Sequence, residues 1–556
     1  MTWTEWAPGV AQFRGYKRAW LRGDLLAGLT VAAYLIPQVM AYATLAGLSP
    51  IVGLWAALAP LLIYALLGSS RHMSVGPEST TALMVVAVLA PFASGDASRY
   101  AALAAVLGVL VGAICFLAGI ARLGFLANLL SRPVLVGYMT GVALVMMASQ
   151  LGKLTGASVV GDEFVDQMRS FARGVGDLHW PTMLLAGAVL AFLLALDRWA
   201  PRVPGPLIAM LAAAAAVAAL SLESNGIVVV GSVPSGLPTP AVPLVSPNEL
   251  AALVIPAAGI AIVAFSDNIL TARIFATRHG YEIDANAELR AIGVCNIAAG
   301  LTRGFPVSSS GSRTAIGDAV GSRTQIYSLV ALSLVLVVML FASDLLAQFP
   351  SAALGALVVY AALRLIDVSE FRRLARFRRS ELVIALMTTA AVLGIGVLYG
   401  VLAAVALSVL DLLRRVARGH DSVLGFVPGV AGMHDIDDYP QAELVPGLVV
   451  YRYDAPLCFA NAEDFRSRAL QAVDHYPQPV EWFVLNAEAN VEIDMTALDA
   501  LDRLRADLEG RGILFAMARV KQDLRDALKA GGLLTKIGDE RIFMTLPTAV
   551  EAFRRR

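Results

Sequence analysis

The sequence predicts an α-helical polytopic membrane protein that ends in a small cytosolic α/β domain. Hydrophobic residues make up 58% of the 556 residues and charged residues only 15%, with a mean hydropathy of +0.69. Soluble domains carry about 25% charged residues. Apolar stretches long enough to span a membrane recur as far as residue 413. Beyond residue 418, short strand-like segments alternate with helical ones, a pattern typical of an α/β domain.

The apolar stretches form two sets of seven, separated by a polar interval at 223–248 that holds five prolines and no lysine or arginine. Fourteen spans are therefore expected. An odd number of spans in each half gives the halves opposite orientations, so the repeats should be inverted. The expected spans are 24–46, 51–69, 76–92, 99–119, 124–151, 180–198 and 205–222, then 250–273, 286–302, 307–319, 324–347, 351–367, 381–396 and 398–413.

Basic residues concentrate in alternate connections, which fixes the expected orientation. Arginines and lysines mark cytoplasmic loops, so both termini should be cytoplasmic in a bacterial-type inner membrane. The loop at 152–179, which holds three basic residues, departs from this rule. The connections assigned to the cytoplasm carry Arg122 and Arg132; Arg198 and Arg202; Arg273, Arg278 and Arg290; and Arg364, Arg372, Arg373, Arg376, Arg378 and Arg379.

Three segments follow from this pattern: an interfacial segment at 1–23, a transporter domain at 24–418 and a cytosolic domain at 419–556. The first segment mixes Trp3, Trp6 and Trp20 with basic residues, which is typical of a membrane interface. The last is expected to contain strands at 448–453, 482–486 and 513–518 and helices at 462–473, 496–511 and 521–530.

A polar break at 305–314, with the sequence F-P-V-S-S-S-G-S-R-T, interrupts the apolar second half. Non-helical backbone at membrane depth is tolerated only where protein or a water-filled cavity covers it. A helix that restarts here would direct its N-terminal amides at an anion. We expect Ser310, Gly311, Ser312 and Arg313 to bind one. Two alternatives stay open: an ordinary loop, and an ion pair between Arg313 and Glu288 or Asp267.

A matching break lies in the first half at Gly76-Pro77-Glu78. Interrupted segments at corresponding places in two halves are the best sequence indication of a transporter's binding site. Proline suits a first helical turn, so the amides of Ser79 and Thr80 should also face the anion. Glu78 is either a proton-coupling carboxylate or a helix cap. An ordinary helix start at the interface is the alternative.

Two further positions carry polar groups inside apolar spans. Gln38 and Tyr42, four residues apart on one helix face, could donate hydrogen bonds to an oxyanion, or could form an ordinary contact between helices. Asp267 is the only carboxylate in the expected eighth span. A carboxylate at that depth indicates a functional site, here binding Na⁺ or carrying a proton. The alternative is a structural pair with Arg273 or Arg313.

The motifs at these positions resemble those of the SulP / solute carrier family 26 anion transporters. The resemblance extends over nearly the whole chain, and its C-terminal part resembles a STAS domain. Within that domain, residues 494–497 stand where the resembling fold carries Asp-Ser/Thr-Ser/Thr-Gly at a helix start. This makes Thr496 the candidate phosphorylation position, although Met495 and Ala497 depart from the pattern and Asp494 is expected to cap a helix. The motifs are Gly28–Val31, Ile36–Ala43, Leu45–Leu48, Ser74–Pro77, Asn286–Leu289 with Gly293, Asn296 and Gly300, and Ser312–Thr314.

The resemblance implies a homodimer in which each protomer has a core domain that carries the anion and a gate domain against which the core moves. It places the anion between the half-helices of the third and tenth expected spans. Family members with an acid at the position of Asp267 are expected to couple anion movement to a cation. A cytosolic protein partner for the STAS-like domain and contact with membrane lipid are also expected.

The expected function is secondary active transport of a small oxyanion by an elevator-like movement, coupled to H⁺ or Na⁺. Sulfate is the first choice, bicarbonate the second and dicarboxylates the third; a passive channel and a STAS-centred scaffold stay open. The formal charge of zero argues against a nucleic-acid partner. No P-loop or HExxH motif indicates an enzyme. No cofactor is expected, and no metal apart from Na⁺ near Asp267, because the three cysteines and six histidines are scattered.

Overall fold

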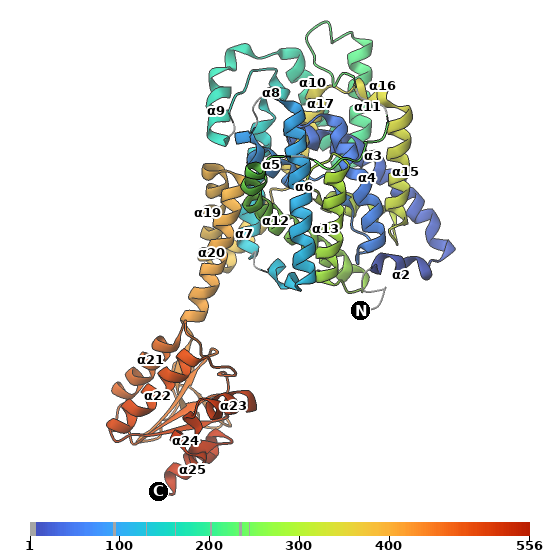
Figure 1. Cartoon of the computed structure of the whole chain (residues 1–556). Helices are drawn as coiled ribbons and strands as arrows, with labels where there is room; N and C mark the ends of the chain where they lie inside the picture. Colours follow the sequence, from blue (N-terminus) through green and yellow to red (C-terminus); the bar gives the residue numbers. More distant parts are fainter. Residues whose placement is uncertain are drawn as a thin grey trace. The chain divides into compact units, whose positions relative to one another are not determined.

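The computed structural model describes residues 7–92, 96–128, 131–161, 163–200, 203–232, 236–243 and 245–556. Trp3 and Trp6, which support the expected interfacial segment, and Arg202, on which the expected orientation partly rests, lie outside the described residues. The chain divides into two compact units, Met1–Ser408 and Val409–Arg556. The first is helical and the second is built on a sheet, and each is shown in Figure 1.

Every expected span of the first half has a helix in the structure. The largest difference between an expected span and its helix is at the fifth span, expected at 124–151. A short 3₁₀ segment at Leu123–Asn128 comes first, and the helix begins only at Arg132, just before Pro133. Helix α5 is followed by a 3₁₀ turn at Ala90–Phe92. The seven helices are α3 (Leu21–Leu45), α4 (Pro50–Leu67), α5 (Ser79–Leu89), α6 (Ala97–Ile120), α7 (Arg132–Ser149), α10 (Trp180–Trp199) and α11 (Gly205–Ala219).

The second half repeats this agreement. Helix α12 begins with a capping box at Ser246 and Glu249, earlier than expected because the cap satisfies its first amides. The helices are α12 (Pro247–His279), α13 (Ala285–Leu301), α14 (Gly311–Val320), α15 (Ile326–Phe341) with α16 (Ser343–Ala347), α17 (Ser351–Leu363), α19 (Arg379–Ile395) and α20 (Val397–Ala417). Shorter helices are α2 (Pro8–Arg14), α8 (Leu151–Thr155), α9 (Phe164–Arg173) and α18 (Val368–Phe377).

Among the described residues, seven helices are long and apolar enough by length and composition to cross a membrane. Several others are shorter, including those at Ser79–Phe92, Gly205–Ala219 and Ile326–Phe341. The third and tenth expected spans fall short because each begins with extended backbone and its α-helix has only 11 and 10 residues, respectively. Both breaks predicted from the sequence are therefore present in the fold.

The two breaks meet in the interior of the first unit. Strand β1 (Val75–Gly76) pairs with β2 (Ser308–Ser309) in antiparallel register, and the ladder continues with the Ser310 amide donating to the Ser74 carbonyl over 2.9 Å. Because all of these residues are buried, each break must find its backbone partners in the other half. The break at 305–314 is thus a buried crossing and not a surface loop.

The helices of the first unit pack in two groups. One group contains α3, α4, α5, α6, α12, α13, α14 and α15; α7, α10, α11, α17 and α19 form the other. Within the first group, α6 and α13 run side by side (Figure 1). A Cβ on Gly293 would lie 2.8 Å from the Gly112 carbonyl oxygen, so only glycine allows this approach.

The second unit contains a six-stranded mixed sheet in the order β4-β3-β5-β6-β7-β8, in which β5 to β8 are parallel. The three expected strands and three expected helices are confirmed; β3, β4, β8, α24 and α25 were not predicted. One face packs against α21 and α22, and α25 covers the other. The elements are β3 (Asp421–Phe426), β4 (Met433–Asp435), β5 (Leu448–Tyr453), α21 (Ala462–Asp474), β6 (Trp482–Asn486), α22 (Met495–Gly510), β7 (Leu514–Ala518), α23 (Gln522–Ala530), α24 (Leu533–Ile537), β8 (Ile542–Phe543) and α25 (Leu546–Arg554).

Candidate anion-binding site

Helix α5 begins at the ladder and is capped by a carboxylate. Glu78 is its N-cap, and its Oε2 accepts a hydrogen bond from the Thr80 amide over 2.7 Å. The Ser79 hydroxyl donates to Oε1 of the same carboxylate. The amide expected to bind an anion is thus occupied by the protein's own carboxylate. Of the two roles considered for Glu78, the helix cap is the one present in the structure.

Helix α14 begins on the other side of the ladder. Ser310 is its N-cap, with Oγ accepting from the Arg313 amide over 3.4 Å and lying 3.2 Å from Ser312 Oγ. The Thr314 hydroxyl donates to the Ser310 carbonyl and accepts from the Ser74 amide. Gly311 has open space where a Cβ would project. The start of α14 therefore presents small polar groups and no carboxylate cap.

Arg313 is fully buried, with 0% of its surface exposed. Its Nη1 donates to Gln38 Oε1 over 3.1 Å and to the Pro77 carbonyl over 2.9 Å, and its Nε donates to Ser74 Oγ over 3.3 Å. Its Nη2 has no hydrogen-bond partner within the described part of the chain. No described carboxylate lies within ion-pair distance of the guanidinium. The expected alternative of an ion pair with Glu288 or Asp267 is wrong.

Gln38 connects Arg313 to Tyr42. Its Oε1 accepts from Arg313, and its Nε2 donates to the Tyr42 hydroxyl oxygen over 2.9 Å. This chain of bonds uses the expected spacing of four residues on α3. Because Gln38 satisfies the lone pair of Tyr42, the Tyr42 proton is left to donate elsewhere.

These groups surround a cavity of about 300 Å³ between the two helix groups. Of the predicted site residues, Gly76, Pro77 and Arg313 do not line it. Gly76 lies in β1, and the Pro77 carbonyl accepts a hydrogen bond from Arg313. Three residues of α17 and its C-terminal end, with Met139 of α7, form the opposite wall. The predicted residues that the structure brings together around the cavity are Gln38, Tyr42, Glu78, Ser79, Thr80, Asp267, Ser310, Gly311 and Ser312.

Asp267 reaches this cavity from α12. Its Oδ2 accepts a hydrogen bond from Ser309 Oγ over 3.4 Å, next to the start of α14. Glu78 lies on the same cavity wall. Two carboxylates therefore line the cavity, and the buried guanidinium of Arg313 lies behind its wall, so the net charge of the site is sensitive to any proton or cation bound there.

Glu288 has a different role from the one expected. Its buried carboxylate accepts bonds from the Tyr64 hydroxyl, the Ser69 amide and hydroxyl, the Ser70 amide and Asn268 Nδ2, at 2.7 to 3.3 Å. These donors come from α4, the segment after it and α12. A charged group with this many donors needs no counterion nearby. Through these bonds, Glu288 of α13 fixes the position of the segment between α4 and β1.

Two polar residues that support the site were not predicted as such. Asn296 on α13 donates from Nδ2 to the Val307 carbonyl over 3.0 Å and accepts from the Val307 amide over 2.8 Å, which holds the approach to β2. Gln325 donates to the Ser70 and Met73 carbonyls over 2.9 Å each, which holds the approach to β1. A polar side chain in an apolar span was the only signal for either role.

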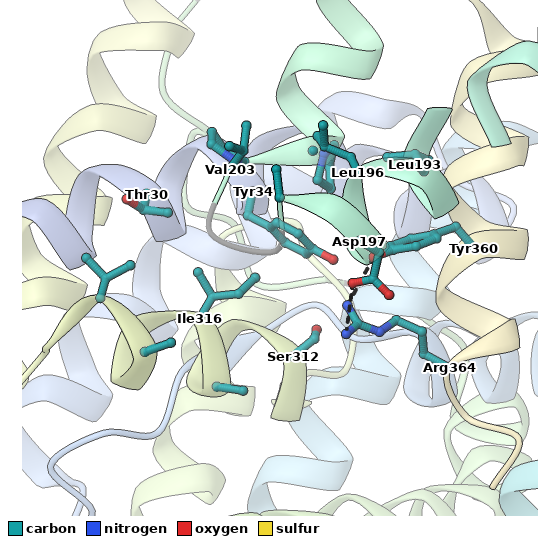
Figure 2. Close-up of a pocket in the computed structure, with 17 residues that line it drawn as sticks. Thr30, Tyr34, Leu193, Leu196, Asp197, Val203, Ser312, Ile316, Tyr360 and Arg364 are labelled. Carbon is teal, nitrogen blue, oxygen red and sulfur yellow. Dashed lines mark hydrogen bonds and ion pairs between the residues drawn. The ribbon is translucent and has the colours of Figure 1, made fainter. Parts of the chain in front are cut away.

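A second cavity, of about 210 Å³, shares Tyr34, Ser312 and Arg364 with the first. In Figure 2, Arg364 points from α17 toward Asp197 of α10, with an Nη2 to Oδ1 distance of 3.3 Å, and its Nη1 donates to Tyr360 over 3.1 Å. From sequence, Arg364 was counted only as a loop charge. The structure instead places it between the two cavities.

In the second unit, Asp494 caps α22 by accepting from the Ala497 amide over 2.9 Å, and it also accepts from the Phe459 amide over 2.6 Å. The cap expected at Asp494 is confirmed. Thr496 lies exposed in the first turn of α22. Phosphorylation at this position stays a prediction.

Comparisons with known proteins agree with this architecture. The sulfate permease family matches residues 21–388, and the STAS domain matches residues 439–549. The chain belongs to the sulfate permease family. Within this family, a probable sulfate transporter of Mycobacterium tuberculosis is 73% identical over 556 residues, which covers 100% of this chain and 99% of the relative. Human solute carrier family 26 member 6 is 35% identical, over 82% of this chain and 63% of its own length.

Solved structures share the sulfate permease fold at lower identity. The murine solute carrier 26 family member A9 anion transporter in its inward-facing state superposes with a TM-score of 0.92 at 23% identity, covering 99% of this chain and 94% of that chain. The transmembrane domain of the cyanobacterial bicarbonate transporter BicA gives a TM-score of 0.61 at 22% identity, covering 71% of this chain and 98% of that chain. The protein is a helical membrane protein with a C-terminal STAS domain.

Proposed function

We propose that this protein is a secondary active transporter of sulfate. The observation that carries the proposal is the 300 Å³ cavity at the start of α5 and α14, which is lined by hydroxyl groups and backed by a buried arginine that no described carboxylate neutralises. Such a cavity favours an anion with several oxygen acceptors. The mycobacterial relative described as a probable sulfate transporter supports sulfate ahead of bicarbonate and dicarboxylates. Membership of the sulfate permease family supports the assignment of this protein as a transporter and not as an enzyme.

Electrostatics argues for coupling to H⁺ or Na⁺. A sulfate dianion in the cavity would face the carboxylates of Glu78 and Asp267. Like charges that share one small cavity repel each other by several kcal/mol unless one of them is neutralised. Protonation of Glu78 would also release the Thr80 amide for the anion, and a proton or Na⁺ at Asp267 would cancel the second charge. Anion and cation then enter together.

The cavity lies between two helix groups, so we propose that the first group carries the anion past the second in an elevator-like movement. The ladder between β1 and β2 holds both half-helices in one group and would keep the site intact during the movement. We place the protein in the inner membrane as a homodimer with both termini in the cytoplasm, where the STAS domain can meet a cytosolic partner.

Uptake of radiolabelled sulfate into proteoliposomes tests the proposal. We expect accumulation above equilibrium when an inward H⁺ or Na⁺ gradient is imposed, and no accumulation without one. Bicarbonate serves as a competitor. Saturable uptake of bicarbonate without sulfate uptake would replace the substrate but keep the mechanism, whereas non-saturable flux without coupling would indicate a channel. Deletion of residues 420–556 should lower the rate without changing the substrate; loss of specificity would favour a STAS-centred scaffold.

Asp267→Asn and Glu78→Gln test the coupling. Each variant keeps the shape of the side chain but removes a titratable charge. One of the two residues is expected to bind the coupling ion. In the variant of that residue, gradient-driven sulfate accumulation should fall by about tenfold or more, while exchange of internal for external sulfate persists. Measuring both fluxes in the same vesicles separates coupling from binding. Unchanged accumulation in both variants would contradict the assignment.

Arg364→Gln tests the wall between the two cavities. Its guanidinium is the cationic group of α17 that lines both, so its loss should raise the KM for sulfate by about tenfold, which corresponds to about 1.4 kcal/mol. Arg372→Gln, on the exposed surface of α18, is the matched control and should leave the KM unchanged. Equal effects of the two substitutions would show that only the general surface charge is important.

A further inference from the structure

Two histidines and an aspartate that are far apart in sequence meet at one end of the first helix group, away from the anion cavity. His72 lies in the segment between α4 and β1, His279 is the last residue of α12, and Asp318 is near the C-terminal end of α14. One ligand atom from each lies within 4.8 Å of the others. The histidines were expected to be scattered, and for His72 and His279 the structure corrects that expectation.

His72 is positioned as a metal ligand would be. It is 2% exposed, and its Nδ1 lies 3.1 Å from the Tyr281 hydroxyl oxygen. Its Nε2 is buried and has no hydrogen-bond partner among the described residues. A buried imidazole nitrogen without a partner is costly unless something binds it. Metal-bound histidines usually fix their second nitrogen by such an outer contact.

The other two side chains lie close to His72, although the two rings are not oriented toward a common point. The His279 ring stacks on His72 with centroids 4.1 Å apart and an interplanar angle of 13°. His279 Nε2 lies 2.6 Å from Asp318 Oδ1, whereas Asp318 Oδ2 accepts from Arg278 over 2.8 Å. Because Arg278 uses the other oxygen, Oδ1 can bind a metal without breaking that ion pair.

We propose that His72, His279 and Asp318 form a site for a divalent transition metal, with Zn²⁺ as the best match. Tetrahedral Zn²⁺ with bonds of about 2.0–2.1 Å spaces its ligand atoms about 3.3 Å apart, within the 4.8 Å spacing of these three atoms. Because the two imidazole rings are nearly parallel, the His279 ring would have to turn out of the stack for both nitrogen lone pairs to point at one ion. Two imidazoles and one carboxylate disfavour Mg²⁺ and Ca²⁺, which prefer oxygen ligands.

The fourth position of the metal would face a neighbouring cavity of about 350 Å³, which is lined by Arg71, Arg323, Tyr281 and both histidines. The two arginines place positive charge there, which weakens the affinity for a cation but favours a hydroxide or chloride as the fourth ligand. Metal binding would join the ends of α12 and α14 to the segment before β1. The expected consequence is a more stable first unit.

Binding of Co²⁺ and Zn²⁺ to the purified, chelator-treated full-length protein tests the site. Co²⁺ should produce the visible absorption of a tetrahedral complex, and Zn²⁺ should abolish it at one ion per chain. Zn²⁺ should also raise the midpoint of thermal unfolding by about 2–4 °C at saturating concentration. Mg²⁺ should do neither.

His279→Gln and Asp318→Asn should each remove the Co²⁺ absorption or weaken Zn²⁺ binding by about 10-fold to 100-fold. His279 is partly exposed, so its variant is expected to fold even if a His72→Gln variant does not. His434→Gln, in the second unit, is the matched control and should bind as the parent does. Identical binding in His279→Gln and the parent, or no tetrahedral Co²⁺ spectrum in the parent, would overturn the proposal.

Discussion

Replacing Arg313 by glutamine is expected to reduce sulfate uptake by at least about 100-fold while leaving the protein in the membrane. The guanidinium is buried, is held by Gln38, Ser74 and Pro77, and lies within ion-pair distance of no described carboxylate. Its full charge therefore acts on the cavity. At an effective dielectric constant of about 20, two unit charges about 4 Å apart interact by about 4 kcal/mol, so a guanidinium behind the cavity wall and a dianion in the cavity attract by a few kcal/mol. Part of this loss would be offset by water, which leaves about two orders of magnitude.

Two controls separate charge from structure. Arg313→Lys keeps the charge but cannot reach all three acceptors, so its uptake should lie between those of the parent and Arg313→Gln. Arg22→Gln removes an exposed charge in the first turn of α3 and should transport normally. The measurement is the initial rate of uptake against sulfate concentration, with size-exclusion chromatography as a check of folding. A well-folded Arg313→Gln variant with the parent's KM and rate would contradict this role.

Glu288→Ala is expected to produce the largest loss of stability. The carboxylate accepts bonds from Tyr64, Ser69, Ser70 and Asn268, which are buried or, for Ser69, half-buried and would lose their acceptor. Removing one partner of a buried charged network costs about 3–5 kcal/mol. We expect the midpoint of thermal unfolding in detergent to fall by about 10 °C, or the protein to aggregate on extraction.

Glu282→Ala, at an exposed position just before α13, is the matched control and should unfold with the parent. Glu288→Gln keeps the size of the side chain and half of its acceptors, so its midpoint should be intermediate. If Glu288→Ala and Glu282→Ala unfold at the same temperature, the network around Glu288 does not support the fold.

Local patterns were enough to predict the spans, both breaks, the i, i+4 pair on α3 and the α/β character of the C-terminal unit. Each depends on spacing or on glycine and proline, which act over a few residues. The partners of the buried charges could not be predicted. Glu288 and Arg313 have opposite charges in apolar surroundings, which left a direct pair open as an alternative. The structure instead surrounds each with neutral groups, and some of these lie 218 to 275 residues away in the chain.

Other features of the site were missed for the same reason. Arg364 belongs to a basic cluster whose sequence is typical of a cytoplasmic loop, and only the packing of α17 against α10 brings it to Asp197 and the cavity wall. Glu78 follows a proline in a pattern that fits either role. Which role it takes depends on whether its carboxylate turns back to the Thr80 amide, a torsional choice that sequence does not encode.

The ladder between β1 and β2 also constrains the order in which the chain can be completed during synthesis. The Ser74 amide donates to a Thr314 hydroxyl that lies 240 residues further along. Until the ribosome has produced that residue, the backbone from Val75 to Gly76 has no strand to pair with, and α5 starts from an unsupported end. The third span is thus synthesised before the strand that pairs with its extended segment, and the tenth span supplies that strand.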